Sequence, residues 1–219
     1  MRVAVKIKKR AADCRPYRFC AILVVLLAAL FASCGAPGEA GGAADGLTEE
    51  FRRFLEIRQS QEQITRTEEL DGYVYTLEGG VLCVHDGIEE IWRSPEEWYA
   101  EDFRLGDVDG DGKADLLFTL WKSYSFGQYS PARMENDDAR VRCHLFLYTL
   151  RAGRMKQLWG SSNLPRPIYA FELTMDGERT PVSSGAVLRT TEGRYTEDFT
   201  HADTREYVYA WRGWGFVEA

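Results

Sequence analysis

The sequence lacks the short motifs that identify many enzymes. It contains no GxSxG, HExxH, P-loop or GxGxxG pattern, so the common hydrolase, metalloprotease and nucleotide-binding signatures are missing. It has no CxxC pair, which disfavours a zinc ribbon or a thioredoxin-type redox site. Histidine is also scarce, and of His85, His144 and His201 we interpret His144, in an aromatic run, as a structural residue. These absences favour a non-enzymatic protein.

Long apolar runs are scarce as well. The one clear example, residues 19–32, follows a leader with seven basic residues. It is shorter than the roughly 17–25 residues that a membrane-spanning helix needs. A basic segment, a short apolar run and then small residues are typical of a secretory signal peptide. We therefore predict export, with a retained membrane helix as the alternative.

The leader ends in the sequence LFASCG, residues 30–35, which resembles the lipobox of bacterial lipoproteins. Phe31 stands where that family usually has leucine. The resemblance implies that residues 1–33 are a lipoprotein signal peptide and that Cys34 becomes an N-terminus acylated with chains such as palmitate. It implies a lipid-anchored, extracytoplasmic protein at the cell membrane or outer membrane. An ordinary secreted protein is the alternative.

Basic residues are in the minority once the leader is removed. The leader holds seven of the 27 Lys and Arg residues and one of the 34 Asp and Glu residues, so the remainder has 20 bases, 33 acids and a net charge of −13. This charge disfavours nucleic acid, whose binding is dominated by Lys and Arg contacts to phosphate. Residues 34–46, rich in Gly and Ala, predict a flexible tether. Residues 47–219 then form a single domain.

Two cysteines, Cys83 and Cys143, remain beyond the leader and Cys34. An exported protein is able to join such a pair in a disulfide. Free cysteine is also often buried as a small apolar residue. Both alternatives remain open at this point.

The periodicity of the domain predicts a short helix followed by strands. Phe51, Phe54 and Leu55 recur at helical spacing and predict an amphipathic helix over 48–58 that packs on the domain. Short runs of aromatic and β-branched residues, separated by Gly, Asp and Pro, predict strands from residue 71 onward. The expected strands are 73–77, 81–85, 89–93, 99–105, 115–121, 141–150, 155–159, 168–173, 185–189, 206–211 and 215–217. The run 116–121 is apolar throughout, which predicts that both of its faces are covered.

The expected strands also show an internal repeat. An aromatic strand followed by a glycine turn occurs at 73–80, 147–153 and 207–213. In the first two copies a strand with a tryptophan, a further strand and an Asp/Gly loop follow in the same order. The third copy stops after its first hairpin, which predicts that the C-terminal hairpin completes a sheet begun by the N-terminal strands.

The most specific motif is DVDGDGKAD, residues 107–115, between two expected strands. Calcium takes about six to eight oxygen ligands, and glycines permit the tight turns that such a loop needs. An EF-hand is excluded because Phe118, in a strand, occupies the place of the last acidic ligand. We predict a calcium loop, with an Asp/Gly-rich turn without metal as the alternative. The predicted ligands are the side chains of Asp107, Asp109, Asp111 and Asp115 and the backbone carbonyl of Lys113.

This motif resembles the FG-GAP or VCBS-type repeats of integrin α-chain propellers and bacterial surface proteins. The resemblance implies that the aspartates bind calcium in a hairpin within a propeller blade. A second loop keeps only Asp176, Gly177 and Glu178, with Pro181 following, and we expect it to have lost the metal. We predict an all-β, small or degenerate β-propeller-like repeat domain. A calcium-stapled β-sandwich is the alternative, because eleven strands make about three blades and closed propellers typically have four to eight.

The best candidate surface for a partner is the insert that follows the calcium loop and its strand. Exposed aromatic residues on a loop stack on sugars or contact protein partners. The candidates are Trp121, Tyr124, Phe126 and Tyr129, and the alternative is that these rings cap the core. We predict a membrane-tethered cell-envelope lipoprotein that binds a protein or glycan partner without catalysis. An envelope hydrolase acting on carbohydrate or phosphate substrates is the alternative.

Overall fold

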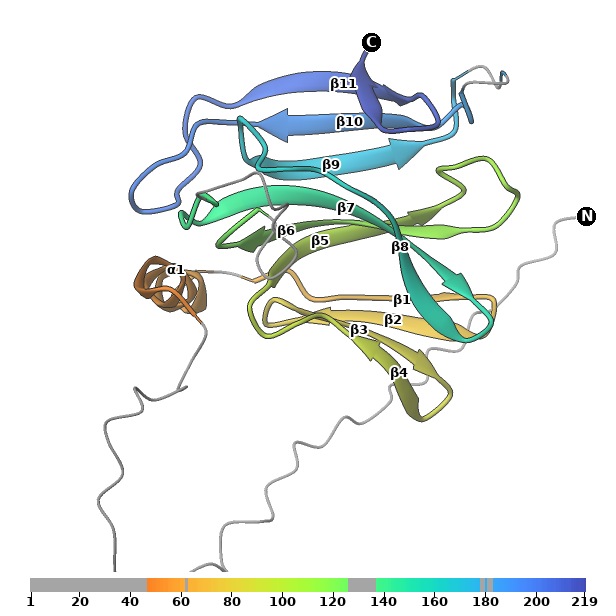
Figure 1. The fold of residues 1–219 in the computed structure, drawn as a ribbon, viewed down its shortest axis with the longest axis horizontal. Coiled ribbons are helices and arrows are strands. Elements are labelled where there is room, and N and C mark those ends of the chain that lie inside the picture. The colour runs from red at the N-terminus through yellow and green to blue at the C-terminus, as the bar shows by residue number, and fades with distance from the viewer. Residues whose placement is uncertain (1–46, 62, 126–136, 178–179, 181–182) are drawn as a thin grey trace, which may run out of the picture. The chain divides into compact units, whose positions relative to one another are not determined.

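The computed structural model describes residues 47–61, 63–125, 137–177, 180 and 183–219. These residues form one α-helix and twelve β-strands (Figure 1). The predicted signal peptide of residues 1–33, the acylated Cys34 and the tether of residues 34–46 lie outside the described residues. Within the described ranges, no helix is long and apolar enough to cross a membrane.

The strands form three antiparallel sheets, each a meander of four strands in chain order. The first sheet contains β1 (Arg66–Leu70), β2 (Tyr73–Glu78), β3 (Val81–Asp86) and β4 (Glu89–Arg93). The second contains β5 (Tyr99–Gly106), β6 (Asp115–Lys122), β7 (Arg142–Arg151) and β8 (Arg154–Gly160). The third contains β9 (Ile168–Thr174), β10 (Val187–Glu192), β11 (Arg205–Trp211) and β12 (Phe216–Glu218). The prediction of an all-β domain preceded by a short helix is confirmed, and none of these sheets closes on itself.

Each predicted strand corresponds to an observed strand, and β1 is the strand that the sequence patterns do not reveal. Its sequence, RTEEL, contains a single apolar residue, Leu70, so it shows no apolar alternation. The prediction that the C-terminal hairpin joins a sheet begun by the N-terminal strands is wrong. Strand β11 pairs with β10, so the hairpin β11–β12 completes the third sheet. The aromatic segments of the repeat also differ in position, because β2 is second in its sheet and β7 and β11 are third.

The second sheet lies between the other two, and Figure 1 shows the three layers. Every residue of β6 is buried, which confirms that this strand is covered on both faces. Leu116, Phe118 and Leu120 belong to the apolar cluster shared with the first sheet. Leu117 and Trp121 belong to the cluster shared with the third sheet. Alternate side chains of one strand therefore fill two separate cores.

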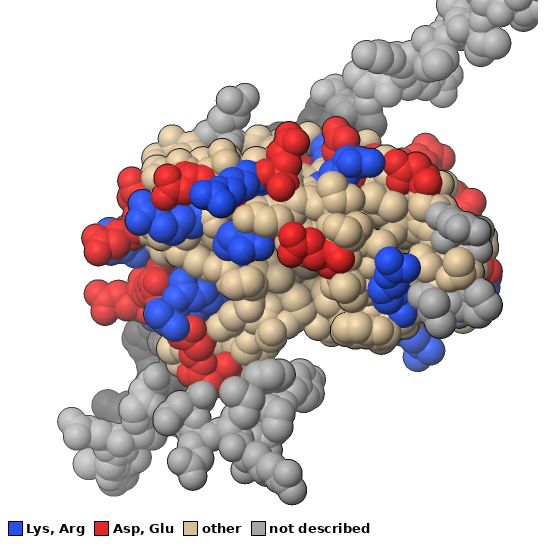
Figure 2. Space-filling model, turned by 90° about the horizontal axis from the view of Figure 1, so that it is seen from above, with Lys and Arg blue, Asp and Glu red and all other residues tan. Residues whose placement is uncertain are grey.

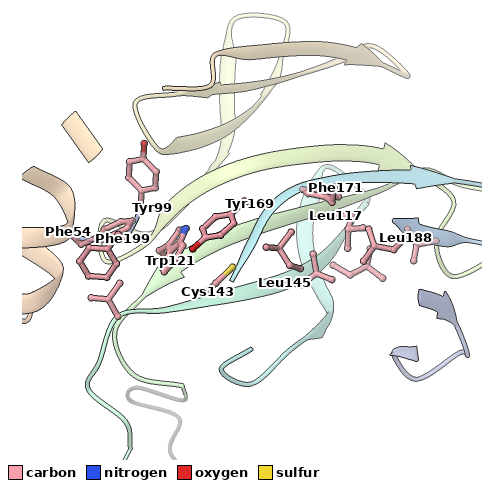
Figure 3. Close-up of a cluster of buried hydrophobic side chains, with 14 of the residues drawn as sticks. Phe54, Tyr99, Leu117, Trp121, Cys143, Leu145, Tyr169, Phe171, Leu188 and Phe199 are labelled. Atoms are coloured by element: carbon pink, nitrogen blue, oxygen red, sulfur yellow. The ribbon is translucent and has the colours of Figure 1, made fainter. Parts of the chain in front are cut away.

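Helix α1 (Glu49–Gln59) covers one end of the core between the second and third sheets. The hydroxyl of Thr48 accepts a hydrogen bond from the amide of Phe51 and caps the first turn. Phe54 has no exposed surface, and its ring centroid lies 5.4 Å from that of Tyr99, 5.3 Å from Trp121 and 5.0 Å from Phe199. Figure 3 shows these rings together at the helix end of the cluster. The predicted helix thus packs on the domain through its apolar face.

Strand β5 takes part in three ion pairs, two of which join it to other elements. Arg58, on the last turn of α1, lies 3.2 Å from the carboxylate of Glu101 on β5. Burial raises the pKa of Glu101, and the charge of Arg58 opposes that rise. The neighbouring Asp102 accepts hydrogen bonds from Arg66 on β1, at 2.9 Å, and from Arg104, at 2.7 Å. These pairs connect the helix and the first sheet to the second sheet.

The outward face of the third sheet is covered by mixed charges. Figure 2 shows acidic and basic side chains next to one another across this side of the molecule, together with uncharged residues. One such pair is Arg189 and Asp176, at 3.4 Å. Exposed pairs of this kind contribute little to stability, so we read this face as an ordinary solvated surface.

The two cysteines of the domain do not form a disulfide. Cys83 lies on β3 in the first sheet, Cys143 lies on β7 in the second, and both are free and buried. Burial raises the pKa of the Cys143 thiol to about 12. Of the two alternatives that the sequence leaves open, the structure shows buried thiols.

His144 is part of the core, which agrees with a structural role but is deeper than the half-buried position that we expect from its aromatic run. It has no exposed surface, and its Nδ1 atom lies 3.3 Å from the carbonyl oxygen of Ser161. Its Nε2 atom is buried without a hydrogen-bond partner among the described residues. Burial, aided by the charge of Lys122, lowers the pKa of His144 to about 3. The imidazole is therefore neutral at physiological pH.

We expect His144 to make the domain less stable when the pH is lowered from 7 to 5. Its pKa is about 3 in the folded state and 6.5 when unperturbed, so between these values only the unfolded chain binds the proton. The free energy of unfolding therefore has its full value above pH 6.5 and decreases as the pH falls toward 3. At about 1.4 kcal/mol per pH unit, the loss by pH 5 is about 2 kcal/mol. Urea unfolding of the wild type and of His144→Asn at pH 7 and pH 5 measures this loss of unfolding free energy.

The comparison uses the pH-induced change within each variant, so a constant loss of packing in His144→Asn cancels. The control is His201→Gln, because His201 is exposed on a loop and burial lowers its pKa less than that of His144. We expect His144→Asn to reduce the pH dependence of the wild type more than the control does. Equal pH dependence in the wild type and His144→Asn would contradict the assignment.

Candidate functional site

The predicted calcium loop, residues 107–115, connects β5 to β6 and ends on the first residue of β6, at the end of the second sheet far from α1 (Figure 1). The strands bring its ends together, because Gly106 and Asp115 are paired in the ladder. Gly110 and Gly112 have φ angles of 83° and 87°. Residues with a side chain rarely adopt these angles, so both glycines are required by the turn. The loop is therefore a tight connection whose shape is fixed by the strand pair.

Within the loop, backbone amides point at carboxylate oxygens. Asp107 Oδ2 accepts from the amide of Gly112 at 3.0 Å, and Asp109 Oδ1 accepts from the amide of Asp111 at 3.0 Å. Asp115 Oδ2 accepts from the amides of Val108 and Asp109, at 3.1 and 3.3 Å. Each of these carboxylates is thus oriented by backbone amides of its own loop.

The loop gathers three of the four predicted carboxylates. Oxygens of Asp107, Asp109 and Asp115 all lie within 4.8 Å of one another. Burial and the nearby charge of Asp109 raise the pKa of Asp115 to about 6. Its Oδ1 atom is buried without a hydrogen bond of normal geometry among the described residues. The group is thus a concentration of negative charge that a cation would neutralise.

The residues present fit a calcium ion. Calcium binds oxygens at about 2.3–2.6 Å, so two ligand oxygens of one ion lie at most about 5 Å apart. The three carboxylates satisfy this limit. All of the donors are hard oxygen atoms, which suit calcium better than zinc or copper. The chemistry that a bound cation would supply here is charge neutralisation across the loop.

Asp111 lies outside the group of three aspartates. The carboxylate Oδ2 of Asp111 pairs with Nη2 of Arg151, at the end of β7. The structure therefore does not bring Asp111 into the group with the other three aspartates. The amide of Lys113 donates to Asp111 Oδ1 at 2.9 Å. A ligand role for the Lys113 carbonyl stays a prediction.

The loop also connects the second sheet to the third. Val108 has no exposed surface and belongs to the core shared by these sheets. The hydroxyl of Ser184, just before β10, donates to the carbonyl oxygen of Val108. Burial of Val108 therefore holds the loop against the segment before β10. The position of the aspartates depends on this contact as well as on β5 and β6.

A small cavity of about 180 Å³ lies beside the loop. It is lined by the turn between β1 and β2, by loop residues Lys113 and Ala114, and by the turn between β7 and β8. Tyr73 and Tyr75 form an aromatic wall, and Asp71 adds an acid. This volume is below the range of about 300–1,000 Å³ typical of small-molecule sites. The cavity therefore carries no separate assignment of function.

The second Asp/Gly loop, between β9 and β10, has a different environment. Asp176 accepts hydrogen bonds from Thr174 at 3.0 Å and from Arg189 at 3.4 Å. These contacts lower the pKa of Asp176, with the Thr174 hydrogen bond as the largest cause. Glu178 and Pro181 lie outside the described residues. Among the described residues, Asp176 belongs to no group of three potential metal ligands.

The aromatic candidates for partner binding divide into two kinds. Trp121 is only 1% exposed, so its prediction as a partner-binding residue is wrong. Its ring lies against Phe54, Tyr195 and Phe199, and it forms part of the core. Tyr124 is 38% exposed and has a φ angle of 60°. Phe126 and Tyr129 lie outside the described residues.

Buried polar contacts hold Tyr124 in place. The ammonium group of Lys122 donates to the carbonyl oxygens of Tyr124 and Ser125, at 2.6 and 2.9 Å. The amide of Tyr124 donates to the carbonyl oxygen of Asp138 at 3.1 Å. The amide of Ser125 donates to Asp137 Oδ1 at 2.8 Å. The two ends of the insert are therefore joined, and the ring of Tyr124 is presented from a fixed backbone.

The sequence patterns do not reveal a second group of potential ligands, Cys83, His85 and Glu90, in the first sheet. The C-x-H spacing within an expected strand is the signal that would have suggested it, because alternate residues of a strand share a face. The position of Glu90 depends on how β3 and β4 pair. The sequence also does not identify Arg151 as the partner of Asp111, because the two residues are 40 positions apart.

The site therefore combines a structured loop, three converging carboxylates and one exposed tyrosine at the other end of the sheet. The likeness of residues 107–115 to FG-GAP or VCBS-type repeats rests on the motif itself. Comparison of the chain with known protein-family models, with curated proteins and with solved structures finds no match.

Proposed function

We propose that the protein is a lipid-anchored, extracytoplasmic lipoprotein whose calcium-stabilised β-domain binds a protein or glycan partner without catalysis. The observation that carries the proposal is the convergence of Asp107, Asp109 and Asp115 within 4.8 Å. Three carboxylates so close repel one another unless a cation is bound. Calcium is abundant outside cells and suits oxygen ligands. A calcium-loaded loop is then the stabilised state of the exported domain.

The three sheets support a propeller-like arrangement as the finer form of this fold. Each sheet is a four-stranded meander in chain order, which is how propeller blades are built. Neighbouring sheets pack face to face through separate apolar clusters. We propose that they correspond to three blades of a small open propeller. A two-layer sandwich accounts less well for a middle sheet that is covered on both faces.

The leader supports the anchor. The LFASCG sequence would make Cys34 the acylated N-terminus. A single acyl chain gives only marginal membrane binding, whereas several chains give stable attachment. Residues 34–46 would then act as a tether between the lipid and the domain. The net charge of −13 beyond the leader supports a membrane contact through lipid alone.

The insert after β6 supports the partner-binding function. Tyr124 presents a ring to solvent from a backbone that Lys122 and Asp138 hold in place. A rigid, half-exposed aromatic ring loses little entropy on binding a protein or a sugar. A hydrolase would instead need an accessible acid–base pair. His144 is enclosed in the core, and the aspartates of the loop are oriented by their own backbone, so neither group supplies such a pair.

We expect calcium to raise the melting temperature of residues 47–219, because only the folded loop gathers the carboxylates. Calcium at one hundred times its dissociation constant adds about 2.7 kcal/mol to the free energy of unfolding. Asp109→Asn and Asp115→Asn should remove most of this gain. Thermal unfolding with chelator and with millimolar calcium measures it. Asp176→Asn, in the other loop, is the control, and an unchanged wild-type melt in calcium would refute the site.

We expect Cys34→Ser to release the full-length protein from the membrane fraction, because the substitution removes the thiol that would be acylated. Fractionation of expressing bacteria and immunoblotting measures the distribution. Cys20→Ser, within the apolar run of the leader, is the control and should leave the protein with the membrane. Membrane association that persists in Cys34→Ser would indicate a retained membrane helix.

We expect a photo-crosslinking phenylalanine derivative at position 124 to capture a partner in intact cells. The position is half-exposed on a fixed backbone, so the substitution leaves the core unchanged. The readout is an adduct of higher mass on an immunoblot. The control is the same derivative at position 88, because Ile88 is fully exposed on the turn between β3 and β4. Identical adducts at both positions, or none at position 124, would contradict a specific surface there.

A further inference from the structure

The first sheet carries a thiol, an imidazole and a carboxylate on one face. Cys83 and His85 are two residues apart on β3, so their side chains point to the same side of the sheet. Val84, between them, points to the opposite side, where it is fully buried in the core shared with the second sheet. Cys83 and His85 therefore lie on the face that is turned away from that core.

A β-bulge brings Glu90 to the same face. Val84 is paired with Trp92, but the next residue, His85, is paired with Glu90, which leaves Ile91 as an extra residue on β4. In a regular ladder His85 would oppose Ile91, and Glu90 would point to the core side. The bulge therefore places the carboxylate beside the imidazole. Bulges often redirect a side chain in this way next to functional sites.

The donor atoms of the three residues converge. The sulfur of Cys83, a ring nitrogen of His85 and a carboxylate oxygen of Glu90 all lie within 4.8 Å of one another. Cys83 is 6% exposed and free, His85 is half-buried and Glu90 is exposed. A small ion would thus reach the sulfur from the solvent side. The thiol is thus the most buried of the three donors, and the imidazole and the carboxylate are more accessible.

The guanidinium group of Arg93 holds the carboxylate. Its Nε lies 3.0 Å from Glu90 Oε1 and its Nη2 lies 2.6 Å from Oε2. These two hydrogen bonds hold the carboxylate in one orientation. An ionised carboxylate has about four lone-pair positions, and Arg93 occupies two of them. Such outer hydrogen bonds commonly orient the ligands of a metal ion.

We propose that Cys83, His85 and Glu90 bind a divalent transition-metal ion, with zinc as the best fit. Zinc binds sulfur at about 2.3 Å and nitrogen or oxygen at about 2.0–2.2 Å, so the ligand atoms of a tetrahedral site lie about 3.3–3.7 Å apart. The observed donor atoms lie within 4.8 Å of one another, so their side chains would close in on the ion when it binds. Sulfur and imidazole donors suit zinc and disfavour calcium. The site thus differs in chemistry from the aspartate loop.

Three protein ligands would leave the fourth tetrahedral position to a water molecule. Metal binding also releases a proton from the thiol of Cys83. Burial raises the pKa of Cys83 to about 11, so the metal-free thiol is protonated. Formation of the metal–sulfur bond therefore breaks the S–H bond and transfers one proton to solvent. The charges of the bound zinc, a thiolate and a carboxylate then cancel, and the guanidinium group of Arg93 adds one positive charge beside them.

The test uses the full-length chain, purified in detergent and treated with a chelator. Cobalt(II) is the probe, because a thiolate ligand gives a charge-transfer band in the near ultraviolet. We expect one equivalent of cobalt to produce the band and one equivalent of zinc, but not calcium, to abolish it. Cys83→Ser should lose the band, and His85→Gln should weaken cobalt binding by about tenfold or more. Glu90→Gln should also weaken binding.

Two controls match these variants. Glu89→Gln changes the neighbouring exposed carboxylate, which is paired with Asp86 instead of His85. Cys143→Ala changes the other free cysteine of the domain, in the second sheet. Both should keep the band. If Cys83→Ser fails to fold, the half-buried His85→Gln still tests the proposal. No band in the wild type, or an unchanged affinity in His85→Gln, would overturn it.

Discussion

Strand β6 is buried along its whole length, because the first sheet covers one of its faces and the third sheet covers the other. Its side chains alternate between two cores, so the strand fixes the spacing of all three layers. The aspartate loop and the aromatic insert adjoin its two ends. The aspartate loop leads into Asp115, the first residue of β6, and the insert begins after Lys122, the last. Displacing β6 would therefore disturb both segments.

The burial of β6 also explains the chemistry of the loop. Asp115 is 1% exposed because it starts a buried strand, and its raised pKa follows from that burial and from Asp109. Val108 is buried on the other side and accepts a hydrogen bond from Ser184, next to the third sheet. The loop thus lies at the junction of two sheets. A cation held there would strengthen the contact between layers as well as the turn itself.

The sequence predicts those parts of the structure that depend on neighbouring residues. The eleven strands follow from short β-rich runs and turn residues, and the double burial of β6 follows from an unbroken apolar run. The turn follows from Gly110 and Gly112. Strand β1 was missed because its only apolar residue is Leu70, and it is recognisable only as an edge partner of β2.

Features that depend on distant residues were not predictable in the same way. The aromatic ring of Trp121 is buried by Phe54 from α1 and by Phe199 from a loop near the C-terminus. Asp111 pairs with Arg151, and Glu90 reaches the face of His85 only through a bulge. The C-terminal hairpin pairs with β10 because the third sheet, like the others, takes its strands in order. No local pattern distinguishes these arrangements from their alternatives.

The chain-order arrangement of the sheets has a consequence for how the domain assembles. Each meander pairs strands that are close in sequence, so the loops closed during its formation are short and pairing is fast. The apolar face of the first meander, however, stays open to water until β5–β8 have formed against it. The second must in turn wait for β9–β12. During synthesis, the core that also buries α1 is therefore complete only when the last hairpin is in place.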